Sequence, residues 1–405
     1  MNKSNKEEIR KNAFAAMDAA AESEIQETRA DLIVTTEDLR EAVKRMRGIV
    51  PKKGKLPILN CMLIQTVWSG RICAKVTGLA STLKYTGRKV TGKLANAILR
   101  LAIPFGSLAS LLPHIRTEHT AFFMMRHGSV TIRSGSLKAE LKIMNVEDYP
   151  EEIGFENAIK FHAAGSLIDE LANASHCTAI DDTRLMLYGA CIEQQENGDF
   201  TIAATDGKRL FVRTVPKLLK NCNLPASLTI SRKNIQRMKH FFSKLNISEF
   251  RCYLDGLHLT LIHKSEQTYS CSFKLIDGIF PNWRFVVPET LKNTLPISAF
   301  AWRWMLDSVS VSRGMQNIKI RIDNPFVHFS ADDVYGNISA SNSYRMLSDE
   351  PFEDSFDGFF NVQFLRDGLD MLKSDTIHFR FNNNQSPVVF ESEHAKYILM
   401  PIRSR

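Results

Sequence analysis

The sequence predicts an α+β protein made of three repeated blocks, each carrying two helices and a set of antiparallel strands. Amphipathic runs that open on Ser, Thr or Asn recur 130 and 132 residues apart in one set, and 124 and 130 apart in a second. The first set begins at Thr36, Ser166 and Ser298, and the second at Ser107, Ser231 and Asn361. Repetition at a near-constant period is the signature of repeated structural units.

The six runs are expected to be helices because their apolar residues recur every three or four positions behind a capping side chain. A hydroxyl or amide side chain at the cap accepts a bond from a free backbone N–H of the first turn. In chain order the runs read TEDLREAVKRM, SLASLLPHI, SLIDELANAS, SRKNIQRMKHFFSKL, SAFAWRWMLDS and NVQFLRDGLDMLKS. Each block therefore receives two helices.

Strands are expected where β-branched and aromatic residues alternate with polar ones and turn residues intervene. Three such stretches are FFMMRHGSVTIRSGSLKAELKIM, FRCYLDGLHLTLIHKSEQTYSCSFKLI and IKIRIDNPFVHFSADDVYGNISAS. Each block also ends on an apolar strand that runs into a proline, at Pro150, Pro281 and Pro401. The C-terminal KYILMP is therefore interpreted as the third copy of a repeated block ending.

These features divide the 405 residues into four parts. Residues 1–30 form an alanine-rich N-terminal extension with little apolar stripe, expected to be a frayed helix or a disordered arm. The repeated domains are expected over residues 31–153, 154–290 and 291–405.

Composition excludes several classes of protein. Hydrophobic residues make up 44% and charged residues 24% of the chain, and no stretch reaches the roughly 18–20 apolar residues of a membrane span. The N-terminus lacks the apolar core of a secretory signal, so the chain is expected to be cytoplasmic. Its seven cysteines are an odd number without a C-x-x-C pair, which predicts buried free thiols and no disulfides or zinc site.

The formal net charge of +8 points to a polyanionic partner. Because the first 30 residues hold five Lys or Arg against six Asp or Glu, the excess belongs to the repeated blocks. Basic residues at helical spacing form two rows: Lys233, Arg237, His240 and Lys244, and Arg40, Lys44 and Arg47. The loop VPKKGKLPIL adds Lys52, Lys53 and Lys55. Such rows suit phosphate contact without base readout, and an ordinary solvated basic face is the alternative.

The apparent motifs for catalysis and nucleotide binding lack residues that those functions require. GRKVTGKL at 87–94 matches G-x-x-x-x-G-K, but Leu94 stands where a P-loop needs a Ser or Thr hydroxyl. Asp181, Asp182 and Asp206 could serve a metal-dependent DNA-modifying enzyme, yet the Asp-Gly pair at 206 is better explained as a tight turn. With neither H-E-x-x-H nor G-x-S-x-G present, we expect no catalytic residues, no metal and no cofactor.

Four segments carry a recognisable pattern: KLPILNCMLIQ at 55–65, TIAATDGKRLFVRTVP at 201–216, KLIDGIFPNWRFVVP at 274–288 and the terminal KYILMPIR. Together they resemble the bacterial DNA polymerase III beta subunit, the replicative sliding clamp, from about residue 31 to the end. The resemblance implies three DNA-clamp domains per chain that close into a ring as a head-to-tail homodimer. Helices would then line a hole through which double-stranded DNA passes.

The same resemblance implies the partners. Members of the family tether the DNA polymerase catalytic subunit, the clamp loader and repair proteins, which attach through clamp-binding peptides. The expected function is that of a non-enzymatic processivity factor in DNA replication, associated with the nucleoid. The alternative is a clamp-like decoy that captures the clamp-binding peptides of a host.

Matched position by position, the resemblance implies two sites. DNA contacts are expected from Lys53, Arg184, Arg232 and Lys233, to which the basic rows and the loop add Arg40, Lys44, Lys52, Lys55 and Arg237. The partner-peptide groove is expected from Leu187, Thr205, Gly207, Lys208, Arg209, Leu210, Pro281, Val286, Ile398, Leu399, Met400 and Pro401.

Some positions depart from the family pattern. Lys208 and Phe285 replace a His and an Arg that are familiar in the family, and Trp283 adds aromatic bulk, so peptide preference is expected to be shifted. Lys138 falls in a strand expected at the dimer interface, whereas the facing segments 309–311 and 332–337 match poorly. These departures, with the basic charge, indicate a divergent clamp.

Overall fold

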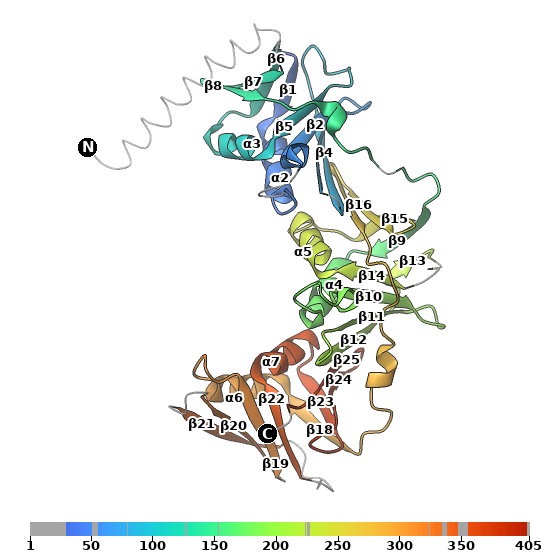
Figure 1. Cartoon of the computed structure of the whole chain (residues 1–405), viewed down its shortest axis with the longest axis vertical. Coiled ribbons are helices and arrows are strands. Elements are labelled where there is room, and N and C mark those ends of the chain that lie inside the picture. The colour runs from blue at the N-terminus through green and yellow to red at the C-terminus, as the bar shows by residue number, and fades with distance from the viewer. Residues whose placement is uncertain are drawn as a thin grey trace, which may run out of the picture. The chain divides into compact units, whose positions relative to one another are not determined.

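The computed structural model describes residues 30–50, 56–78, 80–125, 128–152, 154–222, 224, 227–323, 325–333, 338–346 and 355–402. The predicted N-terminal extension lies outside the described residues except for Ala30. Internal contacts group the chain into two units: unit 1 is Met1–Gly165 with Arg237–Lys274, and unit 2 is Ser166–Gln236 with Leu275–Arg405. Figure 1 labels most of the helices and strands of both.

Unit 1 holds the whole of the first block and part of the second. Its strands are β1 Leu32–Thr35, β2 Cys61–Thr66, β3 Arg71–Gly78, β4 Ser81–Lys89, β5 Arg100–Pro104, β6 His119–Met125, β7 Ser129–Ser134, β8 Leu137–Lys142, β9 Ile159–Ala164, β15 Glu249–Asp255, β16 His258–Lys264 and β17 Thr268–Lys274. Its helices are α2 Thr36–Met46 and α3 Phe105–Leu111, with short 3-10 turns η1 Pro57–Asn60, η2 Leu112–His114 and η3 Val146–Asp148.

Unit 2 holds the rest. Its strands are β10 Gly189–Gln194, β11 Phe200–Thr205, β12 Arg209–Val215, β13 Leu219–Lys220, β14 Leu228–Ser231, β18 Asn293–Ser298, β19 Asn317–Asp323, β20 Phe326–Asp332, β21 Ser339–Arg345, β22 Phe356–Asn361, β23 Thr376–Phe381, β24 Val388–Ser392 and β25 Ala395–Leu399. Its helices are α4 Leu167–Ala174, α6 Ala299–Val309 and α7 Val362–Met371, with η4 Ser175–Cys177, η5 Leu185–Leu187 and η6 Trp283–Val286. Helix α5, Arg232–Phe241, has residues in both units.

The six predicted helices are confirmed, each beginning within two residues of its predicted start. The Ser298 Oγ atom accepts from the Ala301 N–H at 3.3 Å, and the Asn361 Oδ1 atom accepts from the Phe364 N–H at 3.1 Å. Such caps satisfy N–H groups that have no partner inside the helix. Helices α3, α5 and α7 end earlier than predicted, and α5 ends at Phe241. Lys244 has a φ of 60°, so it leaves the predicted basic row.

Each block repeats one pattern twice: a strand, a helix and three antiparallel strands. The predicted stretch IKIRIDNPFVHFSADDVYGNISAS covers β19–β21, which follow the first helix of the third block. These strands therefore correspond to β10–β12, whereas the other two predicted stretches form β6–β8 and β15–β17 and follow the second helix of their blocks. The alternation of polar and apolar residues shows which face of a strand is buried, but it does not show to which half of a repeat the strand belongs.

Strand pairing explains why the chain forms two units. Unit 1 contains a four-stranded sheet, β1-β6-β7-β8, and the consecutive strands β9-β15-β16-β17-β4-β3-β2-β5. Unit 2 contains an eight-stranded sheet, β14-β10-β11-β12-β25-β24-β23-β18, and a four-stranded sheet, β21-β20-β19-β22. The middle block thus contributes one sheet half to each unit, joining its neighbours at β17–β4 and β12–β25. The three-domain boundaries stay a prediction.

In unit 1, a helix and a buried arginine fix the inner face of the β4–β17 junction. The Tyr85 hydroxyl of β4 donates to the Asp38 carboxylate of α2 at 2.6 Å. Arg45 of α2 lies 5.0 Å from the centre of the Tyr269 ring on β17, and its Nη1 donates to the Phe241 carbonyl of α5 at 2.5 Å. Because successive side chains of a strand point to opposite faces, the neighbours of Tyr85 and Tyr269 point away from the helices.

In unit 2, Tyr397 fixes the corresponding face of β25. Its side chain is buried, and its hydroxyl donates to the Phe364 carbonyl of α7 at 2.7 Å. A Cβ atom at Gly368 would lie 2.6 Å from the Tyr397 ring, so the helix approaches this closely only because residue 368 is glycine.

The predicted free thiols are confirmed. All seven thiols are free, and six of them are buried. Burial raises the pKa of Cys61 to about 11 and that of Cys271 to about 12, which keeps both as unreactive thiols near neutral pH. Within the described ranges, no helix is both long and apolar enough to cross a membrane.

One ion-pair cluster joins strands β3 and β4 to the end of the first block at Glu152. Lys84 Nζ of β4 lies 3.1 and 2.9 Å from the two Glu152 carboxylate oxygens, and the Nζ of the buried Lys75 lies 3.6 Å from Glu152. Burial alone would raise the pKa of Glu152, but the charges of Lys84 and Lys75 and their hydrogen bonds outweigh it and lower that pKa from its ordinary value. A lowered carboxyl pKa stabilises the folded state above the unfolded pKa, and this contribution is lost as pH falls.

We therefore expect Glu152→Gln to lower stability at pH 7 by about 0.5–1 kcal/mol, the scale of a partly exposed pair. The difference from the natural protein should shrink as pH falls below about 4.5, where the unfolded carboxyl is already protonated. Urea unfolding at pH 7 and pH 3.5 measures this. Glu151→Gln is the control, and an equal loss in both variants, or a loss independent of pH, contradicts the assignment.

Candidate partner-binding groove and nucleic-acid surface

The predicted groove residues come from segments of unit 2 that meet at the β12–β25 pairing. The register places Leu210 opposite Ile398 and Arg209 opposite Leu399. Beyond the strand, the Met400 N–H donates to the Lys208 carbonyl at 3.1 Å. The predicted residues at 208–210 and 398–400 are therefore brought side by side, although 188 residues separate Leu210 from Ile398 in the sequence.

The turn before β12 is built by its own side chains. Asp206 Oδ1 accepts from the N–H groups of Lys208 and Arg209 at 2.9 and 3.1 Å, and the Gly207 N–H donates to the Thr205 hydroxyl at 3.1 Å. Gly207 has a φ of 87°, a conformation that glycine adopts without strain. The interpretation of Asp206 as a turn residue is confirmed.

The side chain of Arg209 is engaged in contacts within the protein. Its guanidinium lies 3.0 Å from Asp206 and 2.5 Å from Asp367 of α7, donates to the His176 carbonyl at 2.6 Å, and stacks 4.0 Å from the Phe364 ring centre. Only 8% of its side chain is exposed. Arg209 thus ties the groove turn to α7 and holds the turn in place, which sequence reasoning did not reveal.

Under the junction lies an apolar cluster. Its buried members are Cys191, Ala203, Leu210, Val212, Phe280, Val389 and Ile398. Trp283, Val287 and Leu291 of the segment around η6 pack against it. The guanidinium of Arg284 stacks 4.3 Å from the centre of the Trp283 ring. The indole N–H of Trp283 donates to the Glu193 carboxylate at 3.3 Å. Leu210 and Ile398 therefore form a floor and are not themselves exposed, whereas the buried Leu399 pairs with Arg209 and points to the opposite face of the sheet, toward α7.

Apolar side chains remain exposed on the segments around this floor. Phe285 is 87% exposed, and Val286 and Met400 are 48% and 41% exposed. Leu185 and Ile180 are also exposed and were not predicted. Their signal was present in AIDDTRLML, where apolar residues interrupt a turn-rich segment. Isolated exposed apolar residues are ordinary, but several around one apolar floor mark an interaction site.

The predicted groove residues differ in accessibility. Gly207, Lys208, Pro281, Val286 and Met400 are exposed, and Leu187, Thr205 and Pro401 are half-buried. Arg184, predicted as a DNA contact, lies against Gly207, since its Nη1 is 3.4 Å from the position of a Cβ at residue 207. The structure therefore brings Arg184 to the groove turn.

Asp181 and Asp182 show no metal-binding arrangement. Asp181 Oδ1 accepts from the Thr183 backbone N–H at 3.2 Å and from the Thr183 hydroxyl, and this hydrogen bonding lowers the pKa of Asp181. The described residues contain no group of three His, Cys, Asp or Glu placed to bind a metal ion.

The basic row of α2 has the predicted geometry. Arg40, Lys44 and Arg47 are exposed, while Leu39, Val43 and Met46 are buried. The Arg40 guanidinium also donates to the Ile115 carbonyl. In unit 1, the His240 ring of α5 lies 3.0 Å from the Lys44 carbonyl, so the ends of two basic helices adjoin.

The predicted contacts on α5 are more varied. Lys233 is exposed, whereas Arg237 is half-buried and donates to the Ser81 hydroxyl at 2.7 Å. Arg232 donates to the Ser175 carbonyl at 2.7 Å and to the Thr178 hydroxyl at 3.1 Å, so it also supports the end of α4. Lys52, Lys53 and Lys55 lie outside the described residues.

Comparison with known proteins gives a consistent result, although no protein-family model matches the chain. The beta sliding clamp of Haemophilus influenzae is 22% identical over 379 residues, covering 91% of this chain and 99% of that protein. The crystal structure of the DNA polymerase sliding clamp from Caulobacter crescentus has a TM-score of 0.82, with 18% identity and coverage of 92% and 99%. The Helicobacter pylori beta clamp bound to a DNA ligase peptide has a TM-score of 0.80, with 17% identity and coverage of 92% and 100%.

Proposed function

We propose that this chain, a divergent relative of the bacterial beta sliding clamps, is a DNA sliding clamp that encircles duplex DNA and tethers the replicative polymerase for processive synthesis. The observation that carries the proposal is the doubled sheet junction, β17–β4 and β12–β25, which links three blocks of two helices each. The similarity to clamps runs over nearly the whole length of both chains, so it concerns the assembled architecture and not one motif.

The exposed basic helices support DNA binding. Arg40 and Lys44 of α2, Arg47 directly after it and Lys233 of α5 are exposed and positively charged, and the opposite sides of both helices are buried. Such side chains contact phosphates by charge, without reading bases, which suits a protein that must move along DNA. Arg232 and Arg237 remain proposed contacts that also hold their own surroundings in place.

Ring closure by a second copy is supported by two sheet edges. β8 ends the sheet β1-β6-β7-β8 in unit 1, and β21 ends the sheet β21-β20-β19-β22 in unit 2. An edge strand carries unpaired backbone groups that can pair with another chain. We infer that β8 of one copy pairs with β21 of the next, which closes a head-to-tail homodimer.

The groove at β12–β25 supports the capture of partner peptides. An apolar floor with exposed Val286, Phe285 and Met400 around it suits peptides that bury leucine or phenylalanine side chains. The Helicobacter pylori relative was solved with a DNA ligase peptide. The polymerase, the clamp loader and repair proteins are the proposed partners, and the protein acts in the cytoplasm without an active site of its own.

A loading assay tests the proposal. A bacterial clamp loader with ATP should place the chain on nicked circular DNA, and cutting the circle should release it, because a ring is retained by topology. Adding polymerase should lengthen the products. Peptide binding without retention or extension would instead identify the decoy that diverts clamp partners, and would contradict the proposal.

For the groove, we expect Met400→Glu to weaken binding of a leucine- and phenylalanine-containing clamp-binding peptide by 10-fold or more. Burying one such apolar contact contributes about 1.5–3 kcal/mol, and a charge placed beside it opposes that burial. Fluorescence anisotropy of the labelled peptide measures the affinity. The matched control is Met125→Glu, at a methionine of similar exposure, 47% against 41%, on β6. Equal affinity in both variants contradicts the groove assignment.

For the ring, we expect Lys138→Pro to convert the dimer to monomer. The Ile143 N–H bonds back to the Gly128 carbonyl, so by alternation the N–H of Lys138 faces away from β7, toward the free side of β8. Proline removes that donor without disturbing the β7–β8 ladder.

Lys138→Ala keeps the N–H and serves as the control. Analytical ultracentrifugation should show a monomer for the proline variant and a dimer for the alanine variant. A dimer in both would place the interface elsewhere.

A further inference from the structure

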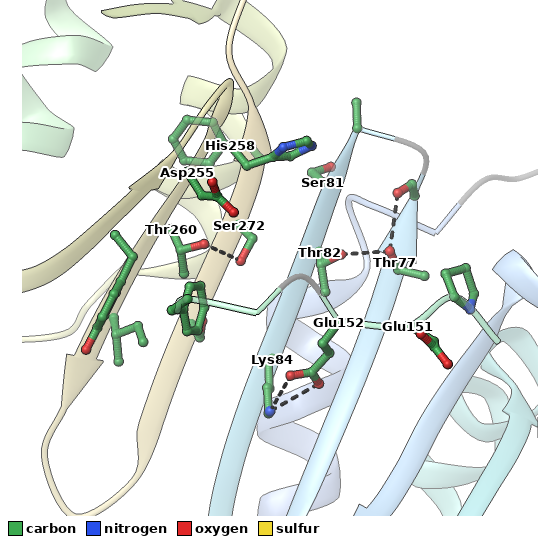
Figure 2. Close-up of a pocket in the computed structure, with 18 of the residues that line it drawn as sticks. Thr77, Ser81, Thr82, Lys84, Glu151, Glu152, Asp255, His258, Thr260 and Ser272 are labelled. Carbon is green, nitrogen blue, oxygen red and sulfur yellow. Dashed lines mark hydrogen bonds and ion pairs between the residues drawn. The ribbon is translucent and has the colours of Figure 1, made fainter. Parts of the chain in front are cut away.

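A cavity of about 460 Å³ opens beside the β4–β17 junction of unit 1 (Figure 2). Thr82 and Lys84 of β4 and Ser272 of β17 line it, together with the β15–β16 hairpin end and Pro150, Glu151, Glu152 and Phe155. The volume falls within the roughly 300–1,000 Å³ of small-ligand sites.

The cavity occupies the position in unit 1 that the candidate groove occupies in unit 2. The order β5-β2-β3-β4-β17-β16-β15-β9 repeats as β14-β10-β11-β12-β25-β24-β23-β18, so the two junctions correspond. The registers also correspond, since Thr82 pairs with Ser272 where Leu210 pairs with Ile398. Pro150 and Pro281, which follow equivalent block endings, introduce the segments that lie against the two sites.

The chemistry of the two sites differs. In the groove, Leu210 and Ile398 are buried in an apolar cluster. In the cavity, the corresponding hydroxyls are already satisfied: Thr82 shares a hydrogen bond with Thr77 at 2.7 Å, and Ser272 shares one with Thr260 at 2.8 Å. Figure 2 shows both pairs on the cavity floor. This floor is polar and neutral, so it does not favour an apolar peptide anchor.

The charge of the lining is negative and partly unbalanced. Lys84 is paired with Glu152, as the dashed lines in Figure 2 show. Asp255, at the end of β15, lines the cavity beside His258, and neither Asp255 nor Glu151 has an ion-pair partner among the residues that the structure describes. In a chain of net charge +8, two unpaired carboxylates at one cavity favour a cationic ligand.

Two aromatic rings form one wall of the cavity. The Phe155 and Tyr253 rings both line the cavity, with ring centres 4.6 Å apart and planes inclined by 31°. A guanidinium group is planar, stacks on aromatic faces and bonds a carboxylate through two N–H groups at once. An ammonium group offers only a point charge to the same surroundings.

We propose that this cavity binds an arginine side chain of a partner polypeptide, with the guanidinium on the Asp255 carboxylate and the aromatic wall of Phe155 and Tyr253. The chain then offers two repeat-related docking sites of different specificity: an apolar one at β12–β25 and a cationic one at β4–β17. The second site does not depend on the groove or on DNA encirclement.

The test uses the full chain and the peptide acetyl-Gly-Gly-Arg-Gly-Gly-amide, titrated by ligand-observed NMR. A second peptide carries citrulline, which has the size of arginine but no charge. We expect the arginine peptide to bind and the citrulline peptide to bind about tenfold more weakly, the scale of one charge-assisted pair.

Asp255→Asn should produce the same loss for the arginine peptide. Asp323→Asn is the matched control, because Asp323 is also the last residue of the first strand of a hairpin, on β19. An apolar clamp-binding peptide, measured on the same samples, reports whether the groove and the fold are intact. Four results would each overturn the proposal. They are a failure of the arginine peptide to bind, equal binding of the citrulline peptide, equal losses of binding in both aspartate variants, and displacement of the arginine peptide by an uncharged disaccharide.

Discussion

The antiparallel pairing of strands from neighbouring blocks is the constraint on which the rest of the structure depends. At β4–β17 and β12–β25, a single register decides which side chains face the helices and which face outward. A slip of one residue would turn Tyr85 and Tyr397 outward and bring Thr82 and Leu210 against the helices. The hydrogen bonds from Tyr85 to Asp38 and from Tyr397 to the Phe364 carbonyl oppose such a slip.

With the register fixed, the outer faces are free to differ. The β12–β25 face pairs Leu210 with Ile398 over an apolar cluster, and the β4–β17 face pairs Thr82 with Ser272 beside unpaired carboxylates. The same repeated frame can therefore present an apolar site and a cation-binding site. Arg209 supports the groove indirectly. It contacts Asp206, Asp367 and Phe364 and so holds the groove turn against α7.

Local signals in the sequence predicted the six helices, the turn at Asp206 and the exposed row of α2, because caps, tight-turn residues and helical spacing act over a few residues. The end of α5 before Lys244, the internal roles of Arg209 and Arg232 and the two contact units were not predictable in this way. Each depends on pairing between residues far apart in the chain, as with Arg209 and Asp367. The cavity at Asp255 was missed for the same reason, since its walls come from segments far apart in the chain.

Particle images of the purified chain by electron microscopy test the central claim most directly. The account predicts closed rings, each formed by two copies around a central hole, and the Lys138→Pro variant should yield only single open copies. Open single copies of the natural protein under conditions where it is folded would contradict the account.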